Sequence, residues 1–211
     1  MEQTTLKLVR LLAPGFLLML LIEPLVGRLP TALTADNFPI EFVKFPTYVV
    51  VFVFVYAAFG LRRLSNGLFA RQIDQNIKDR LWEIGRPSQN PSPDWTSGKA
   101  MQVFYGFVDS DESLKLKASN IRFNGALWTT AADGRAVALI VLLISLAYGV
   151  LIGFYEDILV AIAINGIVFV SSFFVSLHLT NYHKKLGGEQ ITYIQMNLRD
   201  KLSEKLTVAG F

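Results

Sequence analysis

Two long uncharged stretches in the C-terminal half constrain this chain more than any other feature. Residues 136–155 and 158–178 contain no Asp, Glu, Lys or Arg, and only Glu156 and Asp157 separate them. A helix of about 20 apolar residues crosses a hydrocarbon layer about 30 Å thick, because it satisfies its own backbone polar groups there. The sequence therefore predicts a tight hairpin of two membrane-spanning helices.

The N-terminal half predicts a second pair of spans, at about residues 10–27 and 43–61. Each is mostly apolar, and its few polar residues would lie near a membrane interface. A cleaved signal peptide with residues 11–22 as its apolar core is the alternative for the first span, although a good cleavage site is missing. The expected fold is thus an all-α integral membrane protein with four transmembrane helices in two hairpins, in contact with the lipid bilayer.

The basic residues predict how these spans are oriented. Residues 1–10 hold two, residues 62–135 hold eleven and residues 180–211 hold five, which leaves two of the 20 for the rest of the chain. With four spans these three segments share one side, and the positive-inside rule makes that side cytoplasmic. We therefore expect a multi-pass protein of the cell (inner) membrane with both termini in the cytoplasm.

This topology divides the chain into four parts. Residues 1–61 form the first hairpin, 62–135 a cytosolic segment, 136–179 the second hairpin and 180–211 a cytosolic tail. A helical period of apolar residues predicts an amphipathic helix over 62–84, continuous with the second span, and another in the tail. The Pro- and Ser-rich residues 86–99 predict an exposed loop.

The apolar faces of these cytosolic helices are candidate interfaces with neighbouring subunits or a cytosolic protein. The alternatives are packing within the chain itself and adsorption to lipid headgroups, and mixed charge on the polar face favours packing over lipid. Trp95 joins the candidates because an exposed Trp in a loop can serve as a contact residue. The candidate interface residues are Leu64, Leu68, Ile73, Ile77, Leu81, Trp95, Ile194, Leu198 and Leu202.

Residues 100–128 are compatible with two structures. Asp109, Asp111 and Glu112 resemble the start of a helix with an acidic first turn. Apolar and polar residues alternate over 114–124, which instead suits a small β-hairpin. The helix is favoured, because two isolated short strands are marginally stable.

One short internal similarity suggests a duplication. Residues 76–81 (NIKDRL) and 197–202 (NLRDKL) match in residue type at six consecutive positions. Each follows a dibasic-Leu triplet, at 62–64 and 184–186. A parallel repeat of a hairpin followed by an amphipathic helix would produce this pattern, as would any two amphipathic helices of similar composition.

Two polar residues and a set of small residues lie inside the predicted spans. Glu23 is interpreted as an interfacial residue paired with Arg28, with an ion or substrate pathway as the alternative. Asn165 could face a partner helix or line a pore. Small residues allow close helix packing, within the hairpin or between subunits of a homo-oligomer; these are Ser145, Gly149, Gly153, Gly166, Ser172 and Ser176.

The sequence offers no catalytic, cofactor or metal motif. Without Cys there is no thiolate chemistry or Cys-based zinc site, and His178 and His183 lack the spacing and carboxylate of a helical metal pair. Basic and acidic residues interleave over 62–135, eleven against eight, so no nucleic-acid partner is predicted.

These observations favour a non-enzymatic, oligomeric membrane subunit that anchors or signals to a cytosolic partner. The main alternative is a pore-forming or ion-conducting effector triggered from the cytosol. A small transporter that uses Glu23 and an enzyme acting on lipid substrates are further alternatives, and the enzyme would need paired acid and base groups that the sequence does not show.

Overall fold

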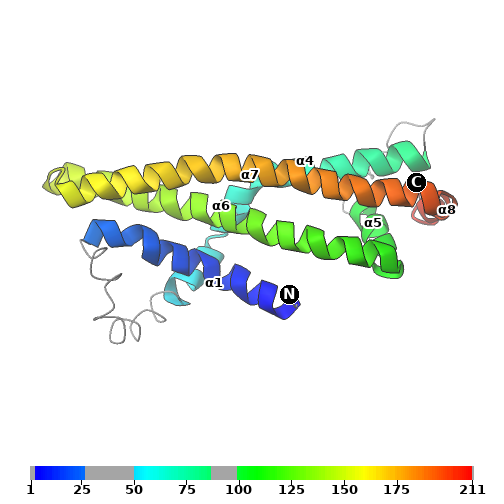
Figure 1. The fold of residues 1–211 in the computed structure, drawn as a ribbon, viewed down its shortest axis with the longest axis horizontal. Coiled ribbons are helices and arrows are strands. Elements are labelled where there is room, and N and C mark those ends of the chain that lie inside the picture. Colours follow the sequence, from blue (N-terminus) through cyan, green and yellow to red (C-terminus); the bar gives the residue numbers. More distant parts are fainter. Residues whose placement is uncertain (1–2, 27–49, 87–98, 211) are drawn as a thin grey trace. The chain divides into compact units, whose positions relative to one another are not determined.

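The computed structural model describes residues 3–26, 50–86 and 99–210, and their elements are helical. They form α1 (Gln3–Ile22), the short 3-10 helix η1 (Glu23–Val26), α4 (Leu61–Gly85), α5 (Lys99–Ser110), α6 (Glu112–Ile152), α7 (Glu156–Asn197) and α8 (Arg199–Val208). Residues 50–58 are also helical. Figure 1 shows α6 and α7 as an antiparallel hairpin.

Among the described residues, three helices are long and apolar enough to cross a membrane. They are Thr4–Leu25, α6 and α7. The predicted second span, 43–61, lies partly outside the described residues, and only its part from residue 50 onward is seen. The predicted all-α fold is therefore confirmed for the described residues, and three helices could cross a membrane, whereas a fourth span is not shown.

The chain divides into two compact units. Unit 1 comprises Met1–Leu68 and Ala126–Leu177, and unit 2 comprises Phe69–Gly125 and His178–Phe211. Neither α6 nor α7 is interrupted where it passes from one unit to the other. The helical structure of α6 and α7 thus continues well beyond the uncharged stretches that mark the predicted spans.

Unit 1 is held by a small apolar core between helices. Leu21 of α1, Tyr56 and Val141 of α6 are buried together, and part-buried side chains such as Ile164 of α7 pack against them. Elsewhere α6 and α7 expose large apolar side chains, for example Leu151, which is 81% exposed. Exposed apolar faces on helices of this length are typical of surfaces solvated by lipid.

A left-handed glycine separates residues 50–58 from α4. Gly60 has φ +61°, a conformation that residues with a Cβ rarely adopt, and the chain turns at residues 59–60 before α4 begins. The prediction that the amphipathic helix continues directly from the second span is therefore wrong. Gly60 provides the conformation that ends one helix and starts the next.

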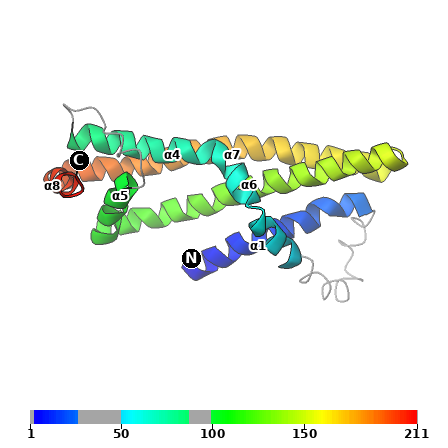
Figure 2. The ribbon, with the colours of Figure 1, turned by 180° about the vertical axis from the view of Figure 1, so that it is seen from behind.

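Unit 2 has its own core, built from five helical pieces. From α4 come Phe69, Ile73, Ile77, Leu81 and Trp82, each at most 7% exposed. The others contribute Phe104 and Phe107 (α5), Leu114 (α6), Ile191 and Ile194 (α7), and Leu202 and Leu206 (α8). Figure 2 shows α4 alongside the C-terminal part of α7. Ile77 of α4 lies next to Gly187 of α7.

The end of α4 is fixed to α8 by both shape and polar contacts. A Cβ at Gly85 would lie 2.3 Å from Leu206 Cδ1, so any side chain at this position would displace Leu206. Arg86 donates hydrogen bonds to Ser203 Oγ at 2.9 Å and to Thr207 Oγ1 at 2.6 Å. The C-terminal helix is thereby an integral part of the core of unit 2.

The β-hairpin considered for residues 114–124 is not formed, because these residues lie within α6. Asp111 starts that helix: its carboxylate accepts a hydrogen bond from the Leu114 amide at 3.1 Å. Residues four apart share a helical face, whereas residues two apart point to different sides. Accordingly Leu114 and Ala118 are buried, and Leu116 between them is 75% exposed.

Candidate functional site

Unit 1 contains a buried charged cluster that the sequence did not indicate. Asp133 of α6 is fully buried, and its carboxylate accepts hydrogen bonds from two side chains. Tyr56 Oη donates to Oδ1 at 2.8 Å. Arg62 donates through Nε to Oδ1 at 2.9 Å and through Nη2 to Oδ2 at 2.7 Å. This is the bidentate geometry of a strong guanidinium–carboxylate pair.

A second arginine extends the cluster to α7. Arg135 is 4% exposed, and its Nη1 donates to Ser176 Oγ at 2.9 Å. Its Nη2 donates to the carbonyl and hydroxyl oxygens of Ser65, whose hydroxyl in turn donates to the Ala132 carbonyl. Arg62 also donates to the Arg10 carbonyl, which brings α1 into the same network.

The cluster therefore connects α1, residues 50–58, α4, α6 and α7 through buried polar contacts. Charges removed from water are tolerated only when they are paired and hydrogen-bonded, and here the carboxylate has three donors. The local signal in the sequence was Asp133 and Arg135 on either side of Gly134, directly before an uncharged stretch. Arg62 and Arg135 entered the sequence analysis through the count of basic residues, and Arg62 also through the dibasic-Leu triplet at 62–64.

Asn165 lies between α7 and α1. It is fully buried, and its Nδ2 donates to the Leu21 carbonyl of α1 at 3.0 Å and to the Ala161 carbonyl of its own helix at 2.8 Å. Interhelical hydrogen bonds of this kind stabilise packing in lipid, where no hydrophobic force drives helices together. In unit 1, Asn165 thus contacts another helix of the same chain.

Glu23 begins η1, at the end of α1, and is partly buried. Its predicted partner Arg28 lies outside the described residues, as does most of the segment that follows. The structure therefore places Glu23 at a change of helix type rather than in the middle of a regular span.

The predicted small residues have different roles. Ser145 is buried and donates to the Val141 carbonyl, while Ser176 binds Arg135. Ser172 Oγ would lie 3.2 Å from a Cβ at Gly134, which marks a close approach of α6 and α7.

The three glycines of this set do not form a helix–helix seam in unit 1. Gly149 makes room for the ring of Phe154, and Gly153 turns the chain after α6 with φ +106°. Gly166 has open space where a Cβ would stand.

Most of the predicted interface residues lie in the core of unit 2. Ile73, Ile77, Leu81, Ile194 and Leu202 are at most 7% exposed. Leu198 is partly buried, and Leu64 is 71% exposed. Trp95 and the Leu68 side chain lie outside what the structure describes. The apolar period of these helices thus reflects packing within the chain.

A different apolar surface is exposed on unit 2. Leu116 and Phe123 of α6 are 75% and 53% exposed, and their spacing of seven residues places them on the same helical face. The polar residues Ser119 and Asn120 between them are also exposed. We call this surface, formed by Leu116, Ser119, Asn120 and Phe123, the α6 face.

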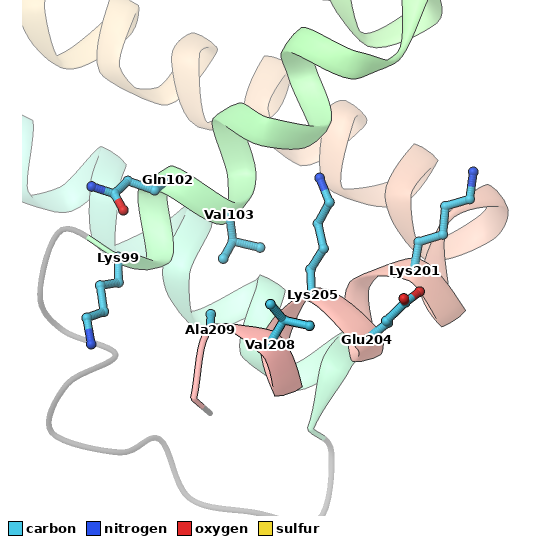
Figure 3. Close-up of a pocket in the computed structure, with 8 residues that line it drawn as sticks. All are labelled: Lys99, Gln102, Val103, Lys201, Glu204, Lys205, Val208 and Ala209. Atoms are coloured by element: carbon cyan, nitrogen blue, oxygen red, sulfur yellow. The ribbon is translucent and has the colours of Figure 1, made fainter.

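A groove of about 620 Å³ lies between α5 and α8 in unit 2, and Lys99, Lys201 and Lys205 are among the residues that line it. Figure 3 shows that their side chains do not converge: Lys99 points to the side opposite Lys205 and Lys201. The Lys205 ammonium lies 4.3 Å from the centre of the Phe107 ring, as in a cation–π contact. Lys205 is thus in contact with a core residue of unit 2.

His183 is partly buried in unit 2. Its Nδ1 lies 3.2 Å from Asn124 Nδ2, which also donates to the Leu179 carbonyl. Nδ1 must accept this hydrogen bond, so a proton there would oppose it. Burial lowers the pKa of His183 from its ordinary value of 6.5, against a smaller opposite effect of the Asp74 carboxylate.

This lowered pKa predicts that stability falls in acid. Between the two pKa values the unfolded chain binds more protons at His183 than the folded chain does, so the free energy of unfolding decreases as the pH falls through about 6.5. Denaturant unfolding between mildly alkaline and mildly acidic pH measures this slope. His183→Gln, which keeps an acceptor for Asn124, should flatten it, and an equal slope in both proteins would contradict the assignment.

Within the described ranges, no group of three or more His, Asp or Glu side chains is arranged to hold a metal ion. No family model matches the chain, and comparisons with curated proteins and with solved structures give no match.

Proposed function

We propose that this protein is a non-enzymatic membrane subunit that holds a docking surface for another protein at the membrane. In this proposal unit 1 anchors the chain, unit 2 faces the cytoplasm, and the α6 face contacts the partner. The exposure of Leu116 and Phe123 carries the proposal, since large apolar side chains outside the uncharged stretches have no lipid to solvate them.

The composition of the α6 face favours a protein partner. Two exposed apolar side chains lie two helical turns apart with the polar Ser119 and Asn120 between them, a mixture of apolar and polar contact groups that protein interfaces also use. Nearby Lys115 pairs with Glu112 at 2.8 Å, and none of the four residues of the α6 face itself carries a charge that would bind anionic lipid.

Photo-crosslinking in cells tests this surface. A photoreactive phenylalanine analogue at Leu116 or Phe123 is expected to form a covalent adduct with one defined second protein. The same analogue at Gln75, an exposed polar position of α4, serves as the control. The double variant Leu116→Asp/Phe123→Asp is expected to reduce recovery of that protein at least about tenfold, as the loss of central apolar contacts does.

Two results would contradict the proposal. Adducts formed only with lipid would assign the α6 face to the membrane surface. Adducts formed only with a second copy of the chain would show that the α6 face serves self-assembly and not binding of another protein. That result would favour the pore-forming alternative, which conductance measurements would then test.

A further inference from the structure

Three cationic side chains from three helices line a second groove of unit 2. Arg80 of α4, Lys117 of α6 and Lys185 of α7 contribute to a groove of about 540 Å³. Glu189 is the one acidic residue among its described lining residues, and Thr192 and Tyr193 add hydroxyl groups. A smaller adjoining groove shares Arg80 and adds one cation, Arg199, and one carboxylate, Glu83. We call the larger one the basic groove.

The cations of the basic groove have no partner in the part of the chain that the structure describes. None of Arg80, Lys117 and Lys185 makes an ion pair or a hydrogen bond there. Exposed cations on helices commonly pair with carboxylates three or four residues away, as Lys115 does with Glu112. Three cations from separate helices against the single carboxylate of Glu189 therefore leave a net positive potential in the groove.

A glycine makes room for the arginine of this groove. A Cβ at Gly188 would lie 2.5 Å from Arg80 Nη1, so the guanidinium lies directly against the backbone of α7. Any larger residue at this position would displace the guanidinium. The position of Arg80 in the groove thus depends on the absence of a side chain at residue 188.

We propose that the basic groove binds a solute that carries two or more phosphate groups. Guanidinium pairs with phosphate through two parallel hydrogen bonds, and lysine ammonium groups add point charges. The groove volume falls in the range of small-molecule sites, which would accommodate a molecule the size of a nucleotide.

The position of the groove along α7 favours a dissolved ligand over a lipid headgroup. Lys185 lies seven residues beyond residue 178, which is about 10 Å at 1.5 Å per residue. The polar layer of a bilayer extends only about 5–8 Å beyond the hydrocarbon on each side. The remaining α7 residues of the groove lie farther along the helix.

Binding to the full-length protein in detergent tests the site. Inorganic tripolyphosphate and adenosine triphosphate are the probes, and the dissociation constant is measured by calorimetry. The triple variant Arg80→Gln/Lys117→Gln/Lys185→Gln is expected to weaken binding roughly a hundredfold, because each nearby unit charge contributes roughly fivefold in water. The matched control Arg71→Gln/Lys115→Gln/Lys201→Gln removes the same charges at exposed positions of unit 2 and is expected to leave binding unchanged.

Gly188→Ala tests the geometry without removing charge, and is expected to weaken binding by a smaller factor than the triple variant.

Failure of the unaltered protein to bind either probe at millimolar concentration, or an equal loss in both triple variants, would overturn the proposal. Nanodiscs with and without anionic phospholipid separate the two sources of phosphate. If the triple variant differs from the unaltered protein only in nanodiscs that contain anionic lipid, the ligand is a lipid headgroup and the proposal of a dissolved ligand is wrong. The test of the basic groove and the test of the α6 face are independent, because the variants used in the two tests share no residue.

Discussion

Replacing Asp133 by alanine is expected to lower the free energy of unfolding by about 3–5 kcal/mol, the largest effect among the substitutions considered for unit 1. The reason is that the fully buried Asp133 carboxylate is the acceptor for the Tyr56 hydroxyl and for the partly buried Arg62 guanidinium, and both would lose it. Titration of the detergent-solubilised protein with a denaturing detergent, followed by circular dichroism, measures the change.

The matched control is the exposed pair of Glu112 and Lys115. Removing it with Glu112→Gln should change stability by less than about 0.5 kcal/mol, because surface pairs are screened by water. A double-mutant cycle with Arg62→Met and Asp133→Leu isolates the coupling between these two side chains. A coupling energy near zero would show that the pair does not hold the helices of unit 1 together.

Leu81→Ala is expected to cost about 2–5 kcal/mol, whereas Leu64→Ala should cost less than about 0.5 kcal/mol. Both leucines lie on α4 and both were predicted to form an interface. Leu81, however, is fully buried in unit 2, and Leu64 is 71% exposed. The same denaturation measurement compares them, and equal effects would contradict the assignment of Leu81 to the core of unit 2.

The uncharged stretches of α6 and α7 could be predicted because a single local property, the absence of charge over about 20 residues, defines them. The length of these helices was not predicted. The predicted cytosolic segment ends at residue 135, where the uncharged stretch begins, yet charge determines where a membrane ends and does not end a helix. No Pro lies between residues 112 and 152, so nothing in the chain stops α6.

The Asp133 cluster could not be foreseen for a different reason. Its partners are distant in the sequence: 71 positions separate Asp133 from Arg62, and 77 positions separate it from Tyr56. Local patterns carry no information about which arginine meets which carboxylate. A single sequence also could not tell whether the apolar period of α4 serves the core of unit 2 or a partner, because both require the same spacing.

The division of unit 2 into two stretches of sequence has a consequence for biosynthesis. Its residues 69–125 leave the ribosome before residues 178–211, because residues 126–177 of unit 1 are made between them. Leu202 and Leu206 of α8 are among the last core residues to be made. Until they arrive, the apolar side chains of α4 and α5 are left without cover, so nascent chains that stall before α8 should be substrates for chaperones and proteases.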